Sequence, residues 1–311
     1  LLKTLLNLGL MQGILQEGLN RLSKLCLDMR VFITGISGFL GRHLARTLEA
    51  EGHKVIGVDI NPKTIAELRR TNPLIPVFEG SICEEETLKE LRYTLMRHKI
   101  THVVHAAANK YIEKNEENPL EAVDVNVTGS ANIAKICQEL KIPVLGISTD
   151  KAENPSSLYG YTKLLMEEMF AVMGYACYRG VNFFGSDGSV IPIWYAQAMA
   201  SKPLTVRNLE CIRYFTPVSQ VVAEIISLLQ DEDLKPSIYL PNLAHSLSLH
   251  DLLDSFMSFY DYSEFVVGKT LSYEKIREEI SSRIQEVPGS VELVHKWLSD
   301  METFDLLQDK R

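Results

Sequence analysis

The chain has 311 residues, of which 46% are hydrophobic and 23% charged, and its formal net charge at pH 7 is -8. This length suffices for one large α/β domain with or without a smaller second lobe, and the composition is that of a globular protein rather than a disordered one. The negative balance argues against a nucleic-acid-binding surface, and no apolar run approaches the roughly 20 residues of a membrane span.

Residues 1–28 form an N-terminal extension ahead of the first strand-like run. Apolar residues recur there at spacings of three and four, which predicts an amphipathic helix. They are Leu8, Met11, Leu15, Leu19 and Leu22. Met29 stands directly before the first strand and is the expected native start, so we interpret the extension as dispensable.

From Met29 onward, short β-branched runs alternate with helix-length amphipathic segments. This alternation is typical of an α/β fold with a doubly wound parallel sheet of the Rossmann type. The expected strands are Val31–Thr34, Lys54–Asp59, Ile75–Glu79, His102–His105, Pro143–Ser148 and Ala176–Gly180. The expected helices begin near Phe39, Pro62, Glu84, Pro119 and Ser157. We therefore predict a Rossmann domain over residues 29–185.

After about Gly185 the alternation gives way to shorter pieces, which predicts a smaller C-terminal lobe over residues 186–311. Helices are expected near Ile191–Ala200, Pro217–Gln230, Leu249–Phe259 and Tyr273–Gln285, with brief strands around Leu204 and Ile238. Because ligand sites favour clefts between domains, we expect this lobe to bind the substrate.

A glycine-rich turn follows the first strand and leads directly into a helix. Glycines at such a turn let the backbone approach a pyrophosphate, which the helix N-terminus attracts. The second strand ends at Asp59, about 20 residues on, where a carboxylate can bind the adenosine ribose. The context predicts binding of NAD rather than NADP, although Lys63 would favour NADP. The residues concerned are Gly35, Ser37, Gly38, Phe39, Leu40, Gly41 and Asp59.

Tyr159 and Lys163 stand four residues apart at the start of a predicted helix, so their side chains share one face. An ammonium group beside a phenol stabilises the phenolate, which can then take a proton from a hydroxyl while hydride leaves the same carbon. Tyr161 is only two residues from Lys163 and should point elsewhere.

A polar cluster, Ser148-Thr149-Asp150-Lys151, ends the preceding strand at the edge where open parallel sheets bind ligands. Thr149 could bond the reacting oxygen, and Asp150 and Lys151 could divide a protonation and a proton abstraction between them. The alternative is an exposed loop whose charges face solvent.

The run from Ser148 to Lys163 resembles the signature of bacterial nucleotide-sugar 4,6-dehydratases of the polysaccharide-biosynthesis (CapD-like) family, which are extended short-chain dehydrogenases/reductases. Three further segments agree: HAAANK from His105, ENPLEA from Glu117 with NVTG from Asn126, and RGVNFFGSDGSVIP from Arg179. The sequence departs from the family at Ser81-Ile82, where an acidic residue usually holds the adenine. It also has Tyr273-Glu274-Lys275 where the family has Gly-Glu-Lys.

The resemblance implies that Thr149, Asp150, Lys151, Tyr159 and Lys163 are catalytic. Tyr159 would act in oxidation at sugar C4, Lys151 would remove the C5 proton, and Asp150 would protonate the departing C6 hydroxyl before hydride returns to C6. UDP-N-acetylglucosamine or a related UDP-sugar is the expected substrate. Further cofactor contacts are expected at Ser81, Ile82, Ala106 and Ala107, and substrate contacts at Lys110, Asn182, Ser189, Arg213 and Glu274. Asn126 would support a backbone kink or a relay water, or would be a buried polar residue.

Two other functions remain open: a nucleotide-sugar 4-epimerase, which does not need Asp150 and Lys151, and a non-catalytic dinucleotide sensor.

The histidines lack ligand spacing, so no metal is expected. Five scattered cysteines indicate a reducing cytoplasm. The resemblance further implies a homo-oligomer assembled through helices beside the active site.

Overall fold

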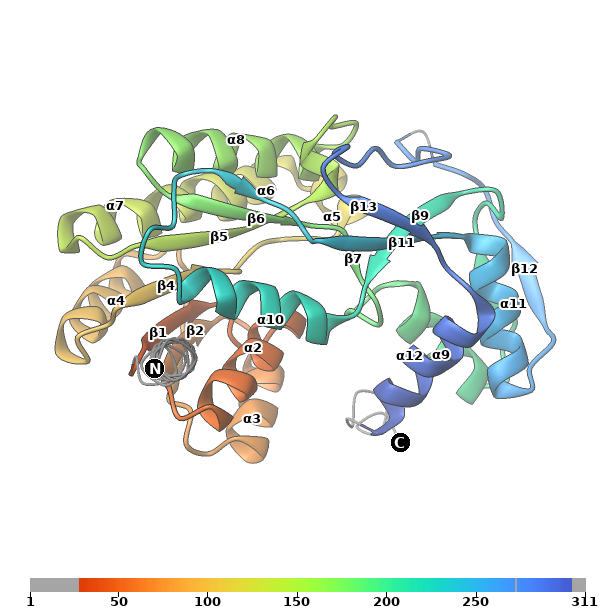
Figure 1. Ribbon diagram of the computed structural model, residues 1–311, viewed down its shortest axis with the longest axis horizontal. Helices are drawn as coiled ribbons and strands as arrows, with labels where there is room; N and C mark the ends of the chain where they lie inside the picture. Colours follow the sequence, from red (N-terminus) through yellow and green to blue (C-terminus); the bar gives the residue numbers. More distant parts are fainter. Residues whose placement is uncertain (1–27, 272, 304–311) are drawn as a thin grey trace, which may run out of the picture.

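The computed structural model describes residues 28–271 and 273–303. These residues form two lobes, a larger one on a seven-stranded sheet and a smaller one on a mixed sheet (Figure 1). The α/β fold predicted from the sequence is thereby confirmed. The helix predicted within residues 1–28 lies outside the described residues.

The sheet of the larger lobe runs in the order β10-β6-β5-β4-β1-β2-β3, and every neighbouring pair is parallel. Its strands are β1 (Arg30–Thr34), β2 (Lys54–Asp59), β3 (Val77–Glu79), β4 (His102–His105), β5 (Val144–Thr149), β6 (Ala176–Gly180) and β10 (Ile238–Tyr239). The order reverses between β1 and β4, which is where open parallel sheets bind ligands at their carboxyl ends. The first six strands agree with the prediction to within two residues at each end.

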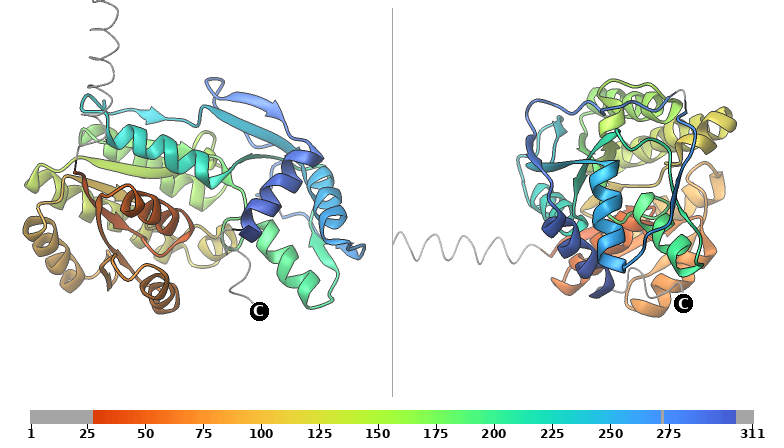
Figure 2. Two further views of the ribbon diagram at one scale, coloured as in Figure 1. Left: turned by 60° about the horizontal axis from the view of Figure 1, so that its bottom comes forward. Right: turned by 90° about the vertical axis from the view of Figure 1, so that its right-hand side faces the viewer.

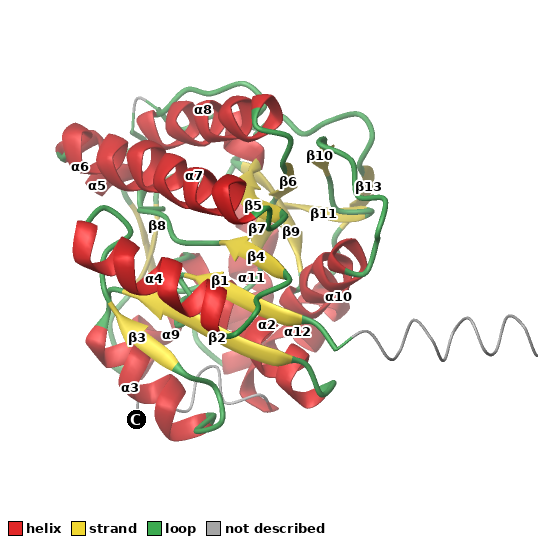
Figure 3. Cartoon of the chain, turned by 90° about the vertical axis from the view of Figure 1, so that its left-hand side faces the viewer, coloured by secondary structure: helices red, strands yellow, loops and turns green. Residues whose placement is uncertain are grey.

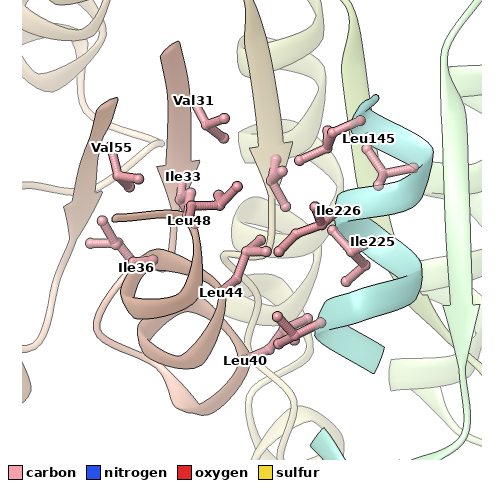
Figure 4. Close-up of a cluster of buried hydrophobic side chains, with 14 of the residues drawn as sticks. Val31, Ile33, Ile36, Leu40, Leu44, Leu48, Val55, Leu145, Ile225 and Ile226 are labelled. Carbon is pink, nitrogen blue, oxygen red and sulfur yellow. The ribbon is translucent and has the colours of Figure 1, made fainter. Parts of the chain in front are cut away.

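Helices cover both faces of this sheet, as Figure 3 shows. On one face are α2 (Phe39–Ala50), α3 (Pro62–Thr71) and α10 (Val218–Leu229); on the other are α4 (Glu85–Arg97), α7 (Ser130–Leu140) and α8 (Leu158–Val172). The central strands are therefore buried on both sides, which explains their continuous apolar runs. Ile225 and Ile226 of α10 pack with Leu40 and Leu44 of α2 (Figure 4).

The segment between β4 and α7 is broken into short pieces rather than the single helix expected from Pro119. These are α5 (Ile112–Glu117), α6 (Pro119–Val123) and a π-helical turn, η1 (Asp124–Gly129). Pro119 disfavours helical backbone at Asn118, which separates α5 from α6. A 3-10 turn, η2 (Asp150–Ala152), likewise links β5 to α8.

The smaller lobe has a sheet of order β13-β11-β9-β7 and a separate pair, β12-β8. Its strands are β7 (Asn182–Phe183), β8 (Leu204–Val206), β9 (Ile212–Thr216), β11 (Leu243–Ser248), β12 (Phe265–Val267) and β13 (Gln285–Pro288). Helices α9 (Val190–Met199), α11 (Leu249–Tyr260) and α12 (Val291–Thr303) gather beside them at one end of the molecule (Figure 2). Trp194, Phe256 and Trp297 are among the aromatic side chains of their shared core.

Helix α10 and strand β10 follow the predicted domain boundary at residue 185 but pack with the larger lobe. Strand β10 pairs with β6, and the apolar face of α10 joins the core around β1 and α2. The chain therefore enters the smaller lobe at β7, returns to the larger lobe, and leaves again at β11.

The predicted helix over Tyr273–Gln285 is wrong, and α12 was not expected. Hydrogen bonds from strand β9 engage the backbone of the 273–285 segment in place of helical bonds. Ile212 N donates to Ile276 O at 2.7 Å, and Arg213 Nη1 donates to Lys275 O at 2.9 Å. These carbonyls are thus bonded to another strand, which overrides the helical spacing of the isoleucines.

Candidate active site

A cavity of about 1400 Å³ opens at the carboxyl ends of the larger sheet and extends to the smaller lobe. Most of the residues singled out from the sequence line it, although they come from ten separate elements or loops. They are Gly35, Gly38, Phe39, Leu40, Gly41, Asp59, Ser81, Ile82, Ala106, Ala107, Lys110, Thr149, Lys151, Tyr159, Lys163, Asn182 and Ser189.

Four of the expected residues are not on the wall of this cavity. Ser37 lies within the glycine turn, and Asp150 is buried directly behind Thr149 and Lys151. Arg213 bonds the backbone of residues 275 and 276. Glu274 bonds Arg207 and the backbone N–H of Leu271. The structure thus brings Ser37 and Asp150 to the site but holds Arg213 and Glu274 within the smaller lobe.

The glycine turn is packed too tightly for side chains at two of its three glycines. Gly35 has φ +70°, and a Cβ there would lie 2.8 Å from Ala107 N. A Cβ on Gly41 would lie 2.2 Å from Gly35 O, so α2 could not pack against the turn. Gly38 precedes α2 without a side-chain cap, which leaves the helix N-terminus available to an anion. This arrangement fits a dinucleotide pyrophosphate.

Asp59 is anchored at the end of β2 by three backbone N–H groups. Its Oδ2 accepts from Ser37 N at 2.9 Å, and its Oδ1 accepts from Ile60 N at 2.8 Å and from Asn61 N at 3.2 Å. The carboxylate therefore shapes the glycine turn as well as the wall of the cavity. The sequence predicted its position but not this link to Ser37.

The polar cluster after β5 is buried and bonded rather than an exposed loop. Thr149 Oγ1 donates to Asp150 Oδ1 at 2.9 Å, and Lys151 Nζ donates to the same oxygen at 2.9 Å. Lys151 Nζ also donates to Asn182 Oδ1 at 3.2 Å. Asp150 is 4% exposed, and among the described residues its buried Oδ2 has no hydrogen-bond partner. A buried polar atom without a partner calls for an explanation, and a catalytic role is one such explanation.

Tyr159 and Lys163 both reach the cavity from α8, but their electrostatics differ from the expectation. Burial and the Asp150 carboxylate raise the pKa of Tyr159, while a hydrogen bond with the Thr149 hydroxyl acts in the opposite direction. Burial lowers the pKa of Lys163 to about 8, and its Nζ lies 3.2 Å from Met166 Sδ. The Lys163 ammonium group therefore contacts Met166 on its own helix instead of lowering the pKa of the Tyr159 phenol. Tyr161 is 56% exposed and points away, as predicted.

A buried charge network behind the site was not foreseen. Glu167 lies one helical turn after Lys163, and Arg179 of β6 donates to both of its oxygens at 2.9 and 2.5 Å. Arg179 also pairs with Glu153, which directly follows η2. Burial raises the pKa of Glu167 to about 7. The sequence signal that could have revealed this network is Glu167 itself, an acidic residue among the buried apolar residues of α8.

The rim of the cavity carries a second unforeseen contact, between the two lobes. Arg42 of α2 bonds both carboxylate oxygens of Asp187 at 2.6 and 2.9 Å, and Lys110 Nζ donates to Asp187 O at 2.6 Å. Burial lowers the pKa of Lys110. Asp187 stands in the loop between β7 and α9, so these bonds connect the glycine-turn helix to the smaller lobe.

Asn126 is fully buried in the π-helical turn and holds two segments together. Its Oδ1 accepts from Asn109 N at 2.7 Å, and its Nδ2 donates to Asn109 O at 3.0 Å and to Thr162 Oγ1 at 3.1 Å. Asn126 thus supports a departure from α-helical geometry and links the loop after β4 to α8.

His105 is fully buried between Thr34 and Ser130, each 2.8 Å away, and burial lowers its pKa to about 3. Within residues 28–271 and 273–303, no group of three or more His, Cys, Asp and Glu side chains is arranged to hold a metal ion. No helix of this part of the chain is long and apolar enough to cross a membrane.

Comparison with protein families matches residues 31–283 to the model described as polysaccharide biosynthesis protein. Among curated relatives, the capsular polysaccharide biosynthesis protein CapD of Staphylococcus aureus is 26% identical over 87% of this chain and 48% of its own length. The inverting UDP-N-acetylglucosamine 4,6-dehydratase of Campylobacter jejuni is 27% identical over 70% of both chains. The UDP-glucose 4-epimerase of Rickettsia akari is 28% identical over 60% of this chain and 59% of its own.

The chain spans between 35% and 62% of the length of three curated relatives, the staphylococcal protein among them. Its identities to the dehydratase and to the epimerase are nearly equal, 27% and 28%. Sequence identity therefore does not separate these two activities.

Solved structures show the same fold over most of the chain. A UDP-glucose 4-epimerase of Thermus thermophilus in complex with NAD has a TM-score of 0.71 at 20% identity, covering 86% of this chain and 93% of its own. A dTDP-glucose 4,6-dehydratase of Streptomyces venezuelae with NAD bound has 0.75 at 16%, covering 89% and 98%. The enzyme WbmG of Bordetella bronchiseptica, with NAD and UDP, has 0.74 at 20%, covering 90% and 96%.

Proposed function

Because the chain belongs to the polysaccharide biosynthesis protein family, within the extended short-chain dehydrogenases/reductases, we propose that it is a nucleotide-sugar 4,6-dehydratase. Its substrate in this proposal is UDP-N-acetylglucosamine or a related UDP-sugar. The observation that carries the proposal is the Asp150–Lys151 pair, bonded at 2.9 Å beside Tyr159. An elimination needs both an acid and a base in addition to the group that serves C4 oxidation.

The residues of the glycine turn suit NAD as the resident cofactor. Gly35 and Gly41 allow the close backbone approach, the uncapped start of α2 suits the pyrophosphate, and Asp59 lines the adjoining wall. When bound there, NAD would accept hydride from sugar C4 and return it to C6. Because no hydride is lost overall, the proposed reaction has no net redox change.

Tyr159 in its phenolate form takes the proton of the C4 hydroxyl in this scheme. The ketone formed at C4 makes the C5 proton acidic, and Lys151 as a neutral amine removes it. Asp150 supplies a proton to the C6 hydroxyl, which leaves as water. Asn182 presents its carbonyl oxygen to Lys151 Nζ, because its Nδ2 is fixed by donation to Tyr214 O at 2.9 Å. The amine is thereby held at the cavity wall.

A mass-spectrometric assay tests the reaction. The protein is incubated with UDP-N-acetylglucosamine and other UDP- or dTDP-sugars without added reductant. A dehydratase gives a product lighter by one water, an epimerase leaves the mass unchanged, and a non-catalytic sensor leaves the substrate intact. An unchanged mass with inverted C4 stereochemistry would establish the epimerase instead.

Two variants separate the roles of the residues. Tyr159→Phe should abolish turnover, because hydride transfer cannot begin without the phenolate. Lys151→Ala should block elimination yet permit C4 oxidation, seen as transient cofactor reduction. Complete dehydration by Lys151→Ala would refute its assignment as the C5 base.

A further inference from the structure

Two neighbouring elements carry the residues assigned to the proposed reaction. Tyr159 and Lys163 lie on α8, whereas Asp150 and Lys151 lie on the 3-10 turn η2. Oxidation uses the first element and elimination uses the second, so one sugar ring has to be within reach of both. A misplacement of about 1 Å between catalytic groups can cost roughly 100-fold in rate. The reaction therefore requires η2 to be held in a fixed position relative to α8.

Steric contact limits how closely these two elements approach each other. A Cβ on Gly160, next to Tyr159 at the start of α8, would lie 2.4 Å from Lys151 O and 3.0 Å from Pro155 Cβ. Because Gly160 has no side chain, η2 packs directly against the first turn of α8. This contact keeps η2 from moving closer, but it does not keep η2 from moving away. An attractive interaction is needed for that.

Arg179 provides attractive interactions with both elements. It lies on β6, where its Cα pairs in register with that of Ser148 on β5. Its Nε and Nη2 donate to the two carboxylate oxygens of Glu167 on α8, at 2.9 and 2.5 Å, and its Nη1 donates to Glu153 Oε2. Glu153 directly follows η2 and donates its backbone N–H to Asp150 O at 3.0 Å. A continuous series of bonds thus connects α8 through Arg179 to η2.

The burial of this bridge restricts its geometry. The side chain of Glu167 is 2% exposed, that of Arg179 14% and that of Glu153 32%. A guanidinium group bonded to both oxygens of a buried carboxylate is fixed in orientation, because any rotation would leave buried charge unpaired. None of these three side chains is part of the cavity wall, so the bridge acts from behind the site.

We propose that Arg179 is a positioning residue, which holds η2 against α8 so that Asp150 and Lys151 reach the sugar bound beside Tyr159. This inference rests on the proposed dehydratase function. Glu153 is the arm of the bridge toward η2, and Glu167 is the arm toward α8. Loss of the first arm should impair elimination, whereas oxidation continues because Tyr159 stays on an anchored helix.

Glu153→Ala tests the arm toward η2. In a single turnover, water loss should slow on the order of tenfold, while cofactor reduction and the KM for the sugar nucleotide change by less than about twofold. Near-ultraviolet absorbance of the reduced cofactor measures oxidation, and mass spectrometry of quenched samples measures elimination. Glu153→Gln keeps an oxygen that can accept from Arg179 and should restore elimination to within about threefold of the wild type.

A double-mutant cycle tests whether Glu153 acts through Arg179. Arg179→Met alone would leave the Glu167 carboxylate buried without a partner, which destabilises the fold, so it is combined with Glu167→Gln. In this background Glu153→Ala should have no further effect on elimination, because its partner is absent. A further loss of about tenfold would show that Glu153 acts on η2 by another route, and the role of Arg179 would be refuted.

Glu139→Ala is the matched control. Glu139 also pairs with an arginine of a neighbouring element, Arg92, but this pair joins α7 to α4. The variant should therefore keep the wild-type ratio of elimination to oxidation.

Amide hydrogen exchange over residues 150–153 provides a measurement that does not depend on the reaction. Exchange should be about tenfold faster in Glu153→Ala than in the wild type and unchanged in Glu139→Ala. Wild-type exchange in Glu153→Ala, or an unchanged ratio of elimination to oxidation, would overturn the positioning role while leaving the dehydratase function intact. Faster exchange in Glu153→Ala, with a wild type that never releases water, would support the bridge and refute the dehydratase function.

Discussion

Asp59 combines two contacts that substitutions can separate. Its carboxylate holds the glycine turn through Ser37 N and also lines the cavity where the adenosine ribose is proposed to bind. Asp59→Ala should weaken NAD binding more than NADP binding, because it removes ribose hydrogen bonds and the repulsion of a 2′-phosphate.

Asp59→Asn separates the two effects, because its carbonyl oxygen can still accept from Ser37 N. We expect this variant to retain more NAD affinity than Asp59→Ala, while still gaining NADP affinity relative to the wild type. Titration calorimetry with both cofactors measures the ratio. An unchanged preference in both variants would remove Asp59 from cofactor selection.

His105 should make the protein less stable in acid. Its pKa is lowered by burial to about 3, so the unfolded chain binds a proton between about pH 6.5 and pH 3 that the folded chain does not. This contribution to stability is complete above pH 6.5 and falls as the pH decreases. The free energy of unfolding should therefore fall by about 2 kcal/mol between pH 6.5 and pH 5 through this group.

Urea unfolding at the two pH values tests this. His105→Gln should lose correspondingly less stability on acidification than the wild type, whereas exposed His98→Gln should behave as the wild type does. Equal acid sensitivity of the His105 variant and the wild type would show that other groups dominate.

At the scale of single residues, spacing revealed which side chains meet but not how they affect one another. Tyr159 and Lys163 share a face of α8 because four residues make about one helical turn. The direction of the Tyr159 pKa, however, depends on Asp150 and on burial, and Lys163 is turned toward Met166. These facts depend on side-chain rotamers, which sequence patterns do not encode.

At the scale of elements, the π-helical turn η1 has a specific supporting residue. Asn126 uses its amide to bond both backbone groups of Asn109 and the Thr162 hydroxyl on α8. Asn126→Ala leaves Asn109 N without its side-chain acceptor, which should cost about 1–3 kcal/mol of unfolding free energy.

Because α8 also carries Tyr159, we expect Asn126→Ala to lower kcat about tenfold, equivalent to about 1.4 kcal/mol. Asn132→Ala is the control, since this side chain lies on the adjoining helix α7 and, within the described residues, is found bonded to Ile82 O alone. A stable Asn126→Ala enzyme with wild-type kcat would restrict the role of Asn126 to folding.

The sequence located the buried strands and helices α9, α10 and α11 well, but it failed beyond residue 272, where the predicted helix is absent and α12 was missed. Strands β2, β4 and β6 have the predicted bounds, because apolar residues buried between the two helix layers fill most of their interior positions. The 273–285 segment has helical spacing, yet Arg213 and Ile212 bond its backbone. Only the fold brings β9 to that segment, so local propensity could not reveal the outcome.

At the scale of the molecule, the Arg42–Asp187 pair connects helix α2, beside the proposed cofactor site, to the smaller lobe. Helix α2 presents its N-terminus to the proposed pyrophosphate site, and Asp187 belongs to the loop that leads into α9. Arg42→Met and Asp187→Asn should each weaken cofactor binding about tenfold, equivalent to about 1.4 kcal/mol.

The exchanged pair, Arg42→Asp with Asp187→Arg, should recover part of the loss, because it restores the attraction with the partners reversed. Lys89→Gln, which removes an exposed pair with Glu86 on α4, should leave cofactor affinity unchanged. Fluorescence titration with the reduced cofactor measures all four proteins. Additive losses without recovery would exclude a direct coupling across the rim.

The predicted homo-oligomer and cytoplasmic location stay predictions.

The return of α10 and β10 to the larger sheet limits how the two halves of this protein can be recombined. The smaller lobe consists of two separate insertions, one from β7 to β9 and one from β11 onward. A chimera that takes its smaller lobe from a relative therefore needs two coordinated exchanges, with residues 217–239 kept from the recipient. A single crossover at residue 185 would instead import a foreign α10 against the native Leu40 and Leu44. Specificity in such an enzyme is more easily changed through individual loops than by transplanting a contiguous domain.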